Sequence, residues 1–430
     1  MSTNSRSSTF VRTEAIAGIT TFFTMAYIVV VNPAILATPG TGMPFYGVMT
    51  ATVLLSFIMT LFMGLYAKLP YAVAPGMGIN AFFVFTVIFS KKVPWPVALG
   101  LVFWAGVLFI IISVTPLRVT IARAIPAGLR TAAAAGIGIF LTFIGLKNAG
   151  FIVADPVTFV KLGQLDAKAM LAVFGIGLTV FMLNRKSPFA FLTGIAAVTV
   201  LAMLAGYVHA PSQILRRPDF SSVLFKLDIL GALKPALFSV IVAILFTDLF
   251  DSISTFIGVS HAAGMLDSEG HPKNLREGLI VDAFATLGAA LLGTSSGTAF
   301  IESSAGIEMG GRTGLTSVFT ALCFLPCLFI GPLVEIVPPY ATAPVLILVG
   351  AFMFRSVAQL SLEKLEDVIP SFLTIILIPL TFSITQGILW GFISHVALYV
   401  MAGRRREVQP MMFAIGAVSV GLLALEHGKW

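Results

Sequence analysis

Charged residues are scarce in this sequence, at 10% of 430 residues, against about a quarter in ordinary soluble domains. Hydrophobic residues make up 58% of the chain, and the mean hydropathy is +1.00. So few polar side chains could not cover the surface of a soluble fold of this length. The composition therefore excludes a soluble globular protein and predicts an all-α polytopic membrane protein.

Cysteine is almost absent, since Cys323 and Cys327 are the only two. Both fall in one uncharged apolar run and lie four residues apart, which suits packing on a buried helix. A disulfide framework is therefore not expected, and no metal site is predicted.

Several enzyme motifs are also missing. The sequence contains no Walker A glycine loop, no H-E-x-x-H and no G-x-S-x-G. ATP hydrolysis and the common hydrolase reactions lose their support, so we expect neither an enzyme nor a bound cofactor. The net charge of +7 comes from Lys and Arg scattered among loops, as is usual for membrane proteins, and nucleic acid is not an expected partner.

Long apolar runs are what the sequence has in abundance. A span needs about 20 apolar residues, and shorter or Gly/Pro-broken runs usually line a cavity or a protein interior. No short apolar core with a small-residue cleavage site precedes the first run, so we expect that run to stay in the mature protein. This criterion predicts fourteen spans, at residues 14–36, 45–67, 71–89, 94–114, 130–149, 167–184, 188–206, 235–261, 275–292, 297–310, 313–334, 341–358, 367–383 and 385–402.

One more apolar stretch, Pro410 to Leu425, follows the basic run Arg404 to Arg406. Its role is left open among a fifteenth span, a dimer contact and an interfacial helix.

The longest polar interruption, His209 to Lys234, divides the predicted spans into seven and seven. Because seven is odd, two such halves would insert with opposite orientation, and an inverted repeat is a natural hypothesis. Lys and Arg are more frequent in the loops on the N-terminal side, which predicts a cytoplasmic N-terminus. The protein is expected in the inner or plasma membrane.

Two spans at matching positions in the halves are broken by glycine and proline. The third reads LPYAVAPGMGINAFFVF, and the tenth reads GTSSGTAFIESSAGIEMG. Half-helices would end at mid-membrane with free N–H groups, ready to receive a polar ligand. Glycines four apart could equally be close helix-packing motifs, and the glycines alone do not separate these readings.

Carboxyl groups at membrane depth point to a functional site, because their burial is unfavourable unless they face a cavity or a partner. Asp248 and Asp251 lie three apart and share a helix face, which Thr255 continues. Glu302 lies in the broken tenth span. For Asp282, a structural hydrogen bond is as plausible as a functional role.

The polar groups within the spans suggest what kind of ligand is bound. Asn80 in the third span has both a donor and an acceptor, although it could simply cap a helix. An anion site would be expected to contain Arg or Lys, and no span interior has either. Carboxylates, an amide, hydroxyls and helix ends suit a neutral ligand with a row of donors and acceptors, such as a heterocyclic base. A buried carboxyl can also carry a proton through a transport cycle.

Four motifs carry a family resemblance: RTEAIAGITTFFTMAYIVVVNPAIL, APGMGINAFF, LFDSISTFIGVSHAAGML and GTSSGTAFIESSAGI. From about Arg12 to Gly403 the chain resembles the AzgA-like branch of the nucleobase-cation symporter-2 family, the adenine, guanine and hypoxanthine permeases. The resemblance implies fourteen spans in two inverted repeats, with short strands in spans 3 and 10 and the substrate between them. It also implies proton-coupled uptake and commonly a homodimer. The implied core domain comprises residues 1–117 and 235–334, the gate domain residues 118–208 and 335–403, and residues 404–430 lie beyond both.

The resemblance also assigns roles to residues. The family's acidic position in the eighth span falls on Asp251, its glutamate in the tenth span on Glu302, and a polar position in the third span on Asn80. This chain has Asp where the uracil branch has Glu, and Ser254 where Gly is usual, so ligand geometry is not transferred in detail. The full set of predicted substrate-binding residues is Glu302, Asp251, Asn80, Thr298, Ser303 and Gly78, and the candidates for proton coupling are Asp251, Glu302, Asp248 and Asp282.

These observations predict a proton-coupled importer of purine bases that works by alternating access. An anion transporter or channel of the same fold is the main alternative, and an intramembrane enzyme is a weaker one. The sequence does not discriminate among adenine, hypoxanthine and guanine.

Overall fold

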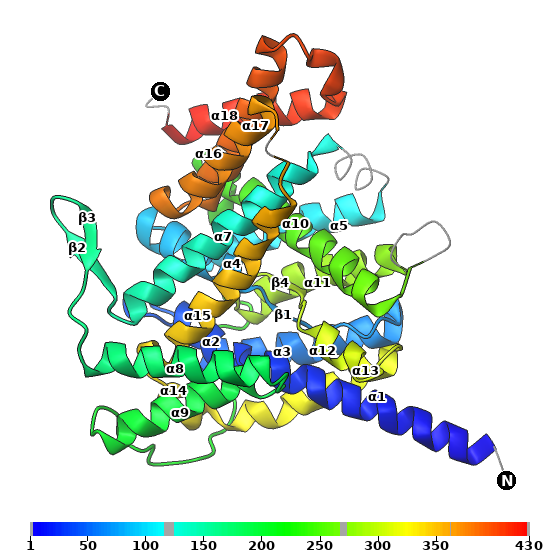
Figure 1. Ribbon diagram of the computed structural model, residues 1–430, viewed down its shortest axis with the longest axis vertical. Helices are drawn as coiled ribbons and strands as arrows, with labels where there is room; N and C mark the ends of the chain where they lie inside the picture. Colours follow the sequence, from blue (N-terminus) through cyan, green and yellow to red (C-terminus); the bar gives the residue numbers. More distant parts are fainter. Residues whose placement is uncertain (1–2, 116–123, 267–272, 362, 428–430) are drawn as a thin grey trace.

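The protein is a bundle of helices, seen in a computed structural model that describes residues 3–115, 124–266, 273–361 and 363–427 (Figure 1). Each of the predicted spans contains one or more helical segments, and in the third and tenth spans a short strand precedes the helix. The helices are α1 (Thr3–Met25), α2 (Ile28–Leu36), α3 (Phe45–Phe62), α4 (Met77–Ala81), α5 (Trp95–Val114), α7 (Ala127–Asn148), α8 (Ala167–Asn184), α9 (Ala190–Leu204), α10 (Phe238–Ala263), α11 (Leu275–Leu292), α12 (Ser303–Glu308), α13 (Gly314–Phe324), α14 (Gly331–Glu335), α15 (Pro339–Phe354), α16 (Leu365–Thr381), α17 (Ile384–Met401) and α18 (Pro410–His427).

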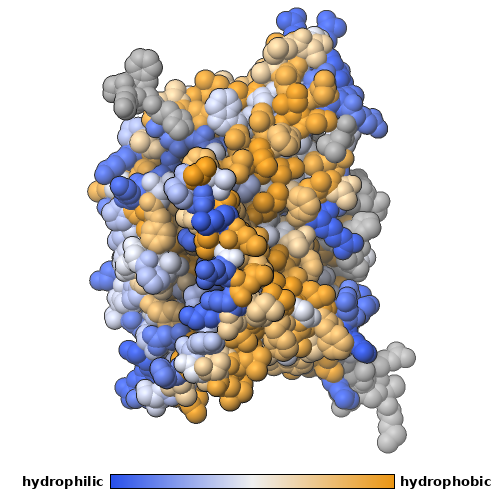
Figure 2. All heavy atoms as spheres, turned by 60° about the vertical axis from the view of Figure 1, so that its left-hand side comes forward, coloured by the Kyte–Doolittle hydropathy of each residue, from blue (hydrophilic) through white to orange (hydrophobic). Residues whose placement is uncertain are grey.

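Eight helical segments in the described part of the chain are long and apolar enough to cross a membrane, and four shorter apolar helices accompany them. Figure 2 shows polar side chains along the left margin and at the right edge of the molecule, with a broad apolar band between them that runs from the top to the bottom of the view. An apolar surface of this extent is expected to face lipid. The prediction of a helical membrane protein therefore agrees with the structure.

The two broken spans meet at the centre of the molecule. Strand β1 (Val73–Pro75) pairs antiparallel with β4 (Gly297–Ala299), so that Ala74 lies opposite Thr298. Pro75 lacks an N–H donor, and Gly293 at the end of α11 has a φ of +94°, so neither segment can continue as a regular helix here. The short strands expected in spans 3 and 10 are thus present.

Side chains from neighbouring helices satisfy the backbone of this small sheet. Thr60 of α3 accepts from the N–H of Val73 and donates to its carbonyl. Ser303 accepts from the N–H of Ala72. Isolated strands buried at membrane depth would otherwise leave backbone groups unpaired, so these hydroxyls fix the position of the sheet.

The helices pack in two groups. In one, α1 packs on α13, α3 on α13 and α11, and α5 on α11 and α10. In the other, α7 packs on α15 and α16, α16 on α17, and α8 on α9 and α15. Glycine pairs allow the closest crossings: Gly64 faces Gly314 in the first group, and Gly138 faces Gly350 in the second. The predicted domain boundary at residues 117 and 118 lies outside the described residues.

One local element was not predicted from the sequence. Strands β2 (Ile152–Asp155) and β3 (Phe159–Leu162) form an antiparallel hairpin between α7 and α8. Asp155 accepts hydrogen bonds from the backbone of Val157 and Thr158 and pairs with Lys161, and these partners lower the pKa of its carboxyl to about 2. Its strands are short and largely exposed, so no long apolar run in the sequence indicates them.

Candidate functional site

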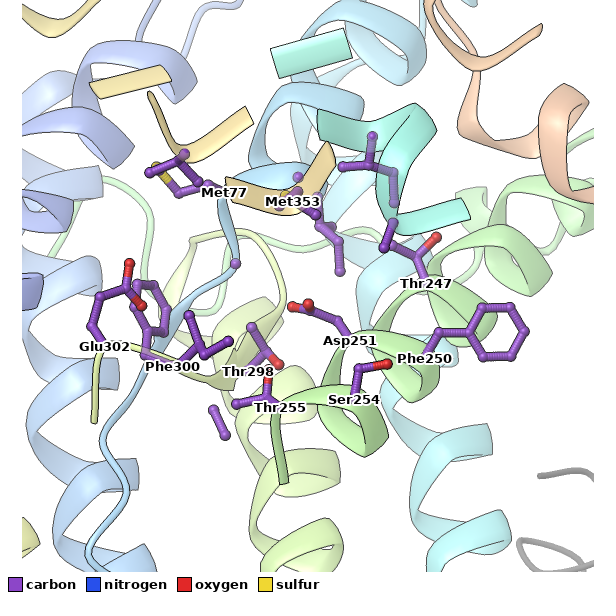
Figure 3. Close-up of a pocket in the computed structure, with 18 of the residues that line it drawn as sticks. Met77, Thr247, Phe250, Asp251, Ser254, Thr255, Thr298, Phe300, Glu302 and Met353 are labelled. Atoms are coloured by element: carbon purple, nitrogen blue, oxygen red, sulfur yellow. The ribbon is translucent and has the colours of Figure 1, made fainter. Parts of the chain in front are cut away.

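A pocket opens beside the β1–β4 pair, where both helix groups contribute walls (Figure 3). The cavity has a volume of about 120 Å³ and opens toward solvent. The first helix group and the two broken spans supply most of its polar residues, whereas α7 and α15 supply only apolar ones. The lining residues are Tyr27, Gly76, Met77, Gly78, Ile79, Ala133, Ala134, Ile137, Thr247, Phe250, Asp251, Ser254, Thr255, Thr298, Ala299, Phe300, Ile301, Glu302, Val349 and Met353.

Two carboxylates face this pocket. Figure 3 shows Asp251, from α10, and Glu302, just after β4, on either side of the cavity with Thr298 and Phe300 between them. Among the described residues that line the pocket there is no Lys, Arg or His. The pocket is therefore an acceptor-rich site that favours ligand N–H donors.

Tyr27 holds Glu302 in place. Its hydroxyl donates to Glu302 Oε1 at 2.5 Å across 275 residues of sequence. The helix breaks between α1 and α2 at Ala26 and Tyr27, and this break lies where the side chain meets the broken tenth span. This hydrogen bond orients the carboxyl group of Glu302 beside the cavity.

Part of the polar helix face predicted for residues 248–255 of α10 reaches the pocket. Asp251 and Thr255 line it together with Ser254 and Thr247, one turn before Asp251. These residues lie at helical spacings of three and four, so one face of α10 forms the polar wall.

Asp248 and Asp282 lie elsewhere, behind the strand. Asp248 accepts hydrogen bonds from Thr286, at 2.5 Å, and from Ser296, while Asp282 accepts from Ser252. Both aspartates are fully buried, and neither lines the pocket. The helix face that Asp248 shares with Asp251 is thus divided between a cluster of hydroxyls and a cavity.

Asn80 and Ser303 also lie behind the pocket wall. Asn80 Oδ1 accepts from Ser295, and Ser303 accepts from the Ala72 N–H. Both side chains are fully buried and do not line the pocket. Direct contact of either with a substrate, as predicted from the sequence, is not supported by this geometry, because each side chain faces the neighbouring broken segment.

Thr298 and Gly78 do line the pocket, as the sequence led us to expect of substrate-binding residues. A Cβ atom on Gly78 would lie 2.6 Å from Ile137 Cγ2 of α7, so a side chain there would collide with the opposite wall. In the described part of the chain no group of three His, Cys, Asp or Glu residues could hold a metal ion.

Sequence reasoning missed the roles of Tyr27, Thr247 and the apolar wall. A lone tyrosine in the run TMAYIVV could have been noticed, because a phenol inside a span usually finds a polar partner. Nothing in the sequence reveals that Ile137 and Met353 close the far side.

Known proteins resemble this chain over most of its length. Residues 12–390 match the permease family model Xan_ur_permease. The adenine permease AdeP of Escherichia coli K12 is 39% identical over 413 residues, covering 96% of this chain and 92% of that protein. The guanine/hypoxanthine permease PbuO of Bacillus subtilis 168 is 40% identical over 418 residues, covering 95% and 96%.

The fold resembles that of a distant transporter. The transmembrane domain of the cyanobacterial bicarbonate transporter BicA superposes with a TM-score of 0.66 at 16% identity, covering 88% of this chain and 97% of that one. At that identity the likeness concerns the fold alone. A transporter family membership also agrees with the expectation that the chain is not an enzyme. The chain belongs to the permease family whose model it matches, in the AzgA-like branch of the nucleobase-cation symporter-2 proteins that its motifs indicated.

Proposed function

We propose that this protein imports purine bases together with protons. The observation that carries the proposal is a pocket with two carboxylates and no cation among its described lining residues. Purine bases present several N–H donors and ring-nitrogen acceptors, which carboxylates and hydroxyls can match. The adenine and guanine/hypoxanthine permeases that resemble the chain at about 40% identity support the same class of substrate.

In this proposal Glu302 accepts from one N–H edge of the base and Asp251 accepts from a second edge or carries the coupling proton. Thr298 adds a hydroxyl, and Gly78 lets the base approach the backbone. Asn80 and Ser303 hold the two broken segments in position. Asp248 and Asp282 remain candidates for proton coupling, since buried carboxyls with hydroxyl partners can exist in either protonation state.

The transport cycle would follow from the two helix groups. We propose fourteen spans in two inverted repeats of seven, with a cytoplasmic N-terminus. The core domain (residues 1–117 and 235–334) carries the polar wall, and the gate domain (118–208 and 335–403) carries the apolar one. An apolar wall makes few directional bonds to the substrate, so the core could move past it during alternating access. A homodimer would anchor the gate domains.

Uptake of labelled bases tests the proposal. Transporter-deficient cells expressing the protein should accumulate at least one of adenine, hypoxanthine and guanine, and an uncoupler should abolish accumulation. Uracil serves as the control base. Transport of another solute with no purine uptake would overturn the proposal, and accumulation that survives the uncoupler would exclude proton coupling.

Anion transport is the second candidate, because the fold also resembles that of a bicarbonate transporter. Two carboxylates in a pocket without a cationic lining residue would repel an anion. Flux of bicarbonate, sulfate and chloride in proteoliposomes should therefore stay at the level of empty vesicles.

A further inference from the structure

Thr247 has a buried hydroxyl without a partner in the pocket wall. Its side chain is 5% exposed and lines the pocket, yet Oγ1 makes no hydrogen bond. Buried threonines on helices usually donate to the carbonyl four residues earlier, as Thr179 does to Gly175 and Thr199 to Ile195. Thr247 departs from this pattern, as Thr21 also does, but Thr247 lies in the pocket wall, where a ligand could take the bond.

The position of Thr247 relative to Asp251 defines what it could bind. The two residues lie four apart on α10, so their side chains stand one above the other on the face that lines the pocket. A carboxylate accepts hydrogen bonds, whereas a hydroxyl can donate as well as accept. Together they match a ring edge that has an N–H donor next to a nitrogen or oxygen acceptor.

We propose that Thr247 is a specificity-determining residue that hydrogen-bonds the acceptor atom beside the N–H group held by Asp251. This inference rests on the proposed function, because it takes a purine as the ligand. A site built to bond a polar atom discriminates strongly against a ligand that lacks it, since the buried group is then left unpaired.

Kinetics of matched variants test the role of Thr247. Thr247→Val removes the hydroxyl at nearly constant volume, and Thr247→Ser keeps it. Thr247→Val should raise KM about tenfold or more for at least one of adenine, hypoxanthine and guanine, and by unequal factors among the three. Thr247→Ser should stay within about threefold of the wild-type protein for each base, with membrane abundance checked by immunoblot.

Unchanged KM values in Thr247→Val for all three bases would overturn the inference. An equal rise for all three would remove its specificity role. If the valine variant does not reach the membrane, Thr247→Ala supplies the same comparison. A wild-type protein that moves no purine contradicts the proposed function instead, so the two failures are distinguishable.

A separate observation concerns α18, whose placement the sequence left open. Its buried face consists of residues spaced three and four apart: Met412, Ile415, Ser419, Leu422 and Leu423. Its outward face is apolar and includes Phe413, Val418, Val420 and Leu425, with 36–56% of each side chain exposed. An interfacial helix would need a charged face, which α18 lacks between Pro410 and Leu425.

Helix α18 also packs antiparallel against α17. Leu422 and Leu423 cluster with Leu389 near the beginning of α17, and Gly416 packs against Val396 farther along it. Eighteen residues span about 27 Å, close to the thickness of the hydrocarbon core.

Charged groups lie at both ends of this apolar helix. Arg404 pairs with Glu366 and Glu407 before it begins. At the other end Glu426 pairs with Lys91 at 2.5 Å and accepts hydrogen bonds from Ser239 and Gln386, which stand near the beginnings of α10 and α17.

We infer that α18 is a further membrane span, which places the C-terminus on the opposite side of the membrane from Arg404–Arg406. Site-directed labelling tests this topology. In a background with Cys323 and Cys327 replaced by serine, one variant carries a cysteine appended after Trp430 and the other carries Arg405→Cys. A membrane-impermeant maleimide should label only one of them in intact cells and both after permeabilisation.

Labelling of both variants in intact cells, or of neither, would show that the two positions lie on the same side and would overturn the inference. The comparison does not depend on which side the N-terminus occupies.

Discussion

Four carboxyl groups of α10, α11 and the tenth span fall into two pairs with different surroundings, one fully buried and one partly exposed. Asp251 and Glu302, the front pair, line the pocket. Asp248 and Asp282, the rear pair, lie behind the strand among hydroxyl groups of Ser252, Thr286 and Ser296. Asp248 and Asp251 lie only three positions apart on one helix. Depth in the membrane therefore marks a residue as important but does not say whether it faces the cavity.

The pairs also differ in what their hydrogen-bond partners do. Ser296 precedes β4, and Thr286 and Ser252 belong to α11 and α10, so the rear pair links the tenth span to two helices. Tyr27 is the partner of Glu302 on the pocket side. Asp248 and Asp282 thus connect packed segments of the chain, whereas Asp251 and Glu302 face the cavity.

The largest effect is expected from the front pair. Glu302→Gln and Asp251→Asn should each reduce purine uptake at least about 100-fold, because the amide cannot ionise and presents a donor where an acceptor is needed. Thermal stability in detergent should change little. Glu308→Gln is the matched control, since Glu308 is exposed and lies outside the pocket. Uptake near the wild-type level in both front-pair variants would eliminate the proposed roles of these residues.

The rear pair should affect stability and coupling instead of binding. Asp248→Ala removes an acceptor for the hydroxyls of Thr286 and Ser296, which should lower the free energy of unfolding by about 1–3 kcal/mol and lower Tm by a few degrees.

Asp282→Asn distinguishes a structural role of Asp282 from a role in carrying the coupling proton. If Asp282 carries the proton, counterflow of base persists while uncoupler-sensitive accumulation is lost. Loss of both activities together, with normal abundance, would contradict that role.

A smaller effect is expected at Tyr27. Tyr27→Phe removes the donor to Glu302 but keeps the ring, and should raise KM for purines about fivefold to tenfold with little change in Tm. The double variant Tyr27→Phe/Glu302→Gln should be no worse than Glu302→Gln alone. Additive losses in the double variant would mean that Tyr27 acts on the substrate independently of Glu302.

The smallest effect on transport is expected at Ser303, although the sequence grouped it with substrate ligands. Ser303→Ala removes the acceptor for the Ala72 N–H and should lower stability by about 1 kcal/mol while KM stays within twofold. A KM change as large as that of Tyr27→Phe would indicate that Ser303 contacts the substrate.

Much of the fold was predictable because membrane insertion depends on local hydrophobicity. Windows of about 20 residues located the helices, and glycine with proline located the two interruptions. The two central strands were expected only through the family resemblance, and the pairing of Ala74 with Thr298 came from the structure. The β2–β3 hairpin was missed because its strands carry no apolar run of that length.

The candidate site was predictable in composition but not in geometry. Glu302 and Asp251 stood out because a carboxyl group is rarely buried without a reason. Asn80 stood out because its amide has both a donor and an acceptor, but its Oδ1 accepts a hydrogen bond from Ser295 of the other broken segment. Tyr27 could not be paired with Glu302 from the sequence, because nothing local connects residues 275 positions apart.

The membrane class, the positions of the apolar segments, the two breaks and the family follow from composition and from motifs read along the chain. Which carboxyl groups face the cavity depends instead on how the helices pack. Residues three apart on a helix point roughly 60° away from each other, enough to direct one into a pocket and the other into packed hydroxyl groups. That choice depends on which neighbours surround α10, and those neighbours come from distant parts of the chain.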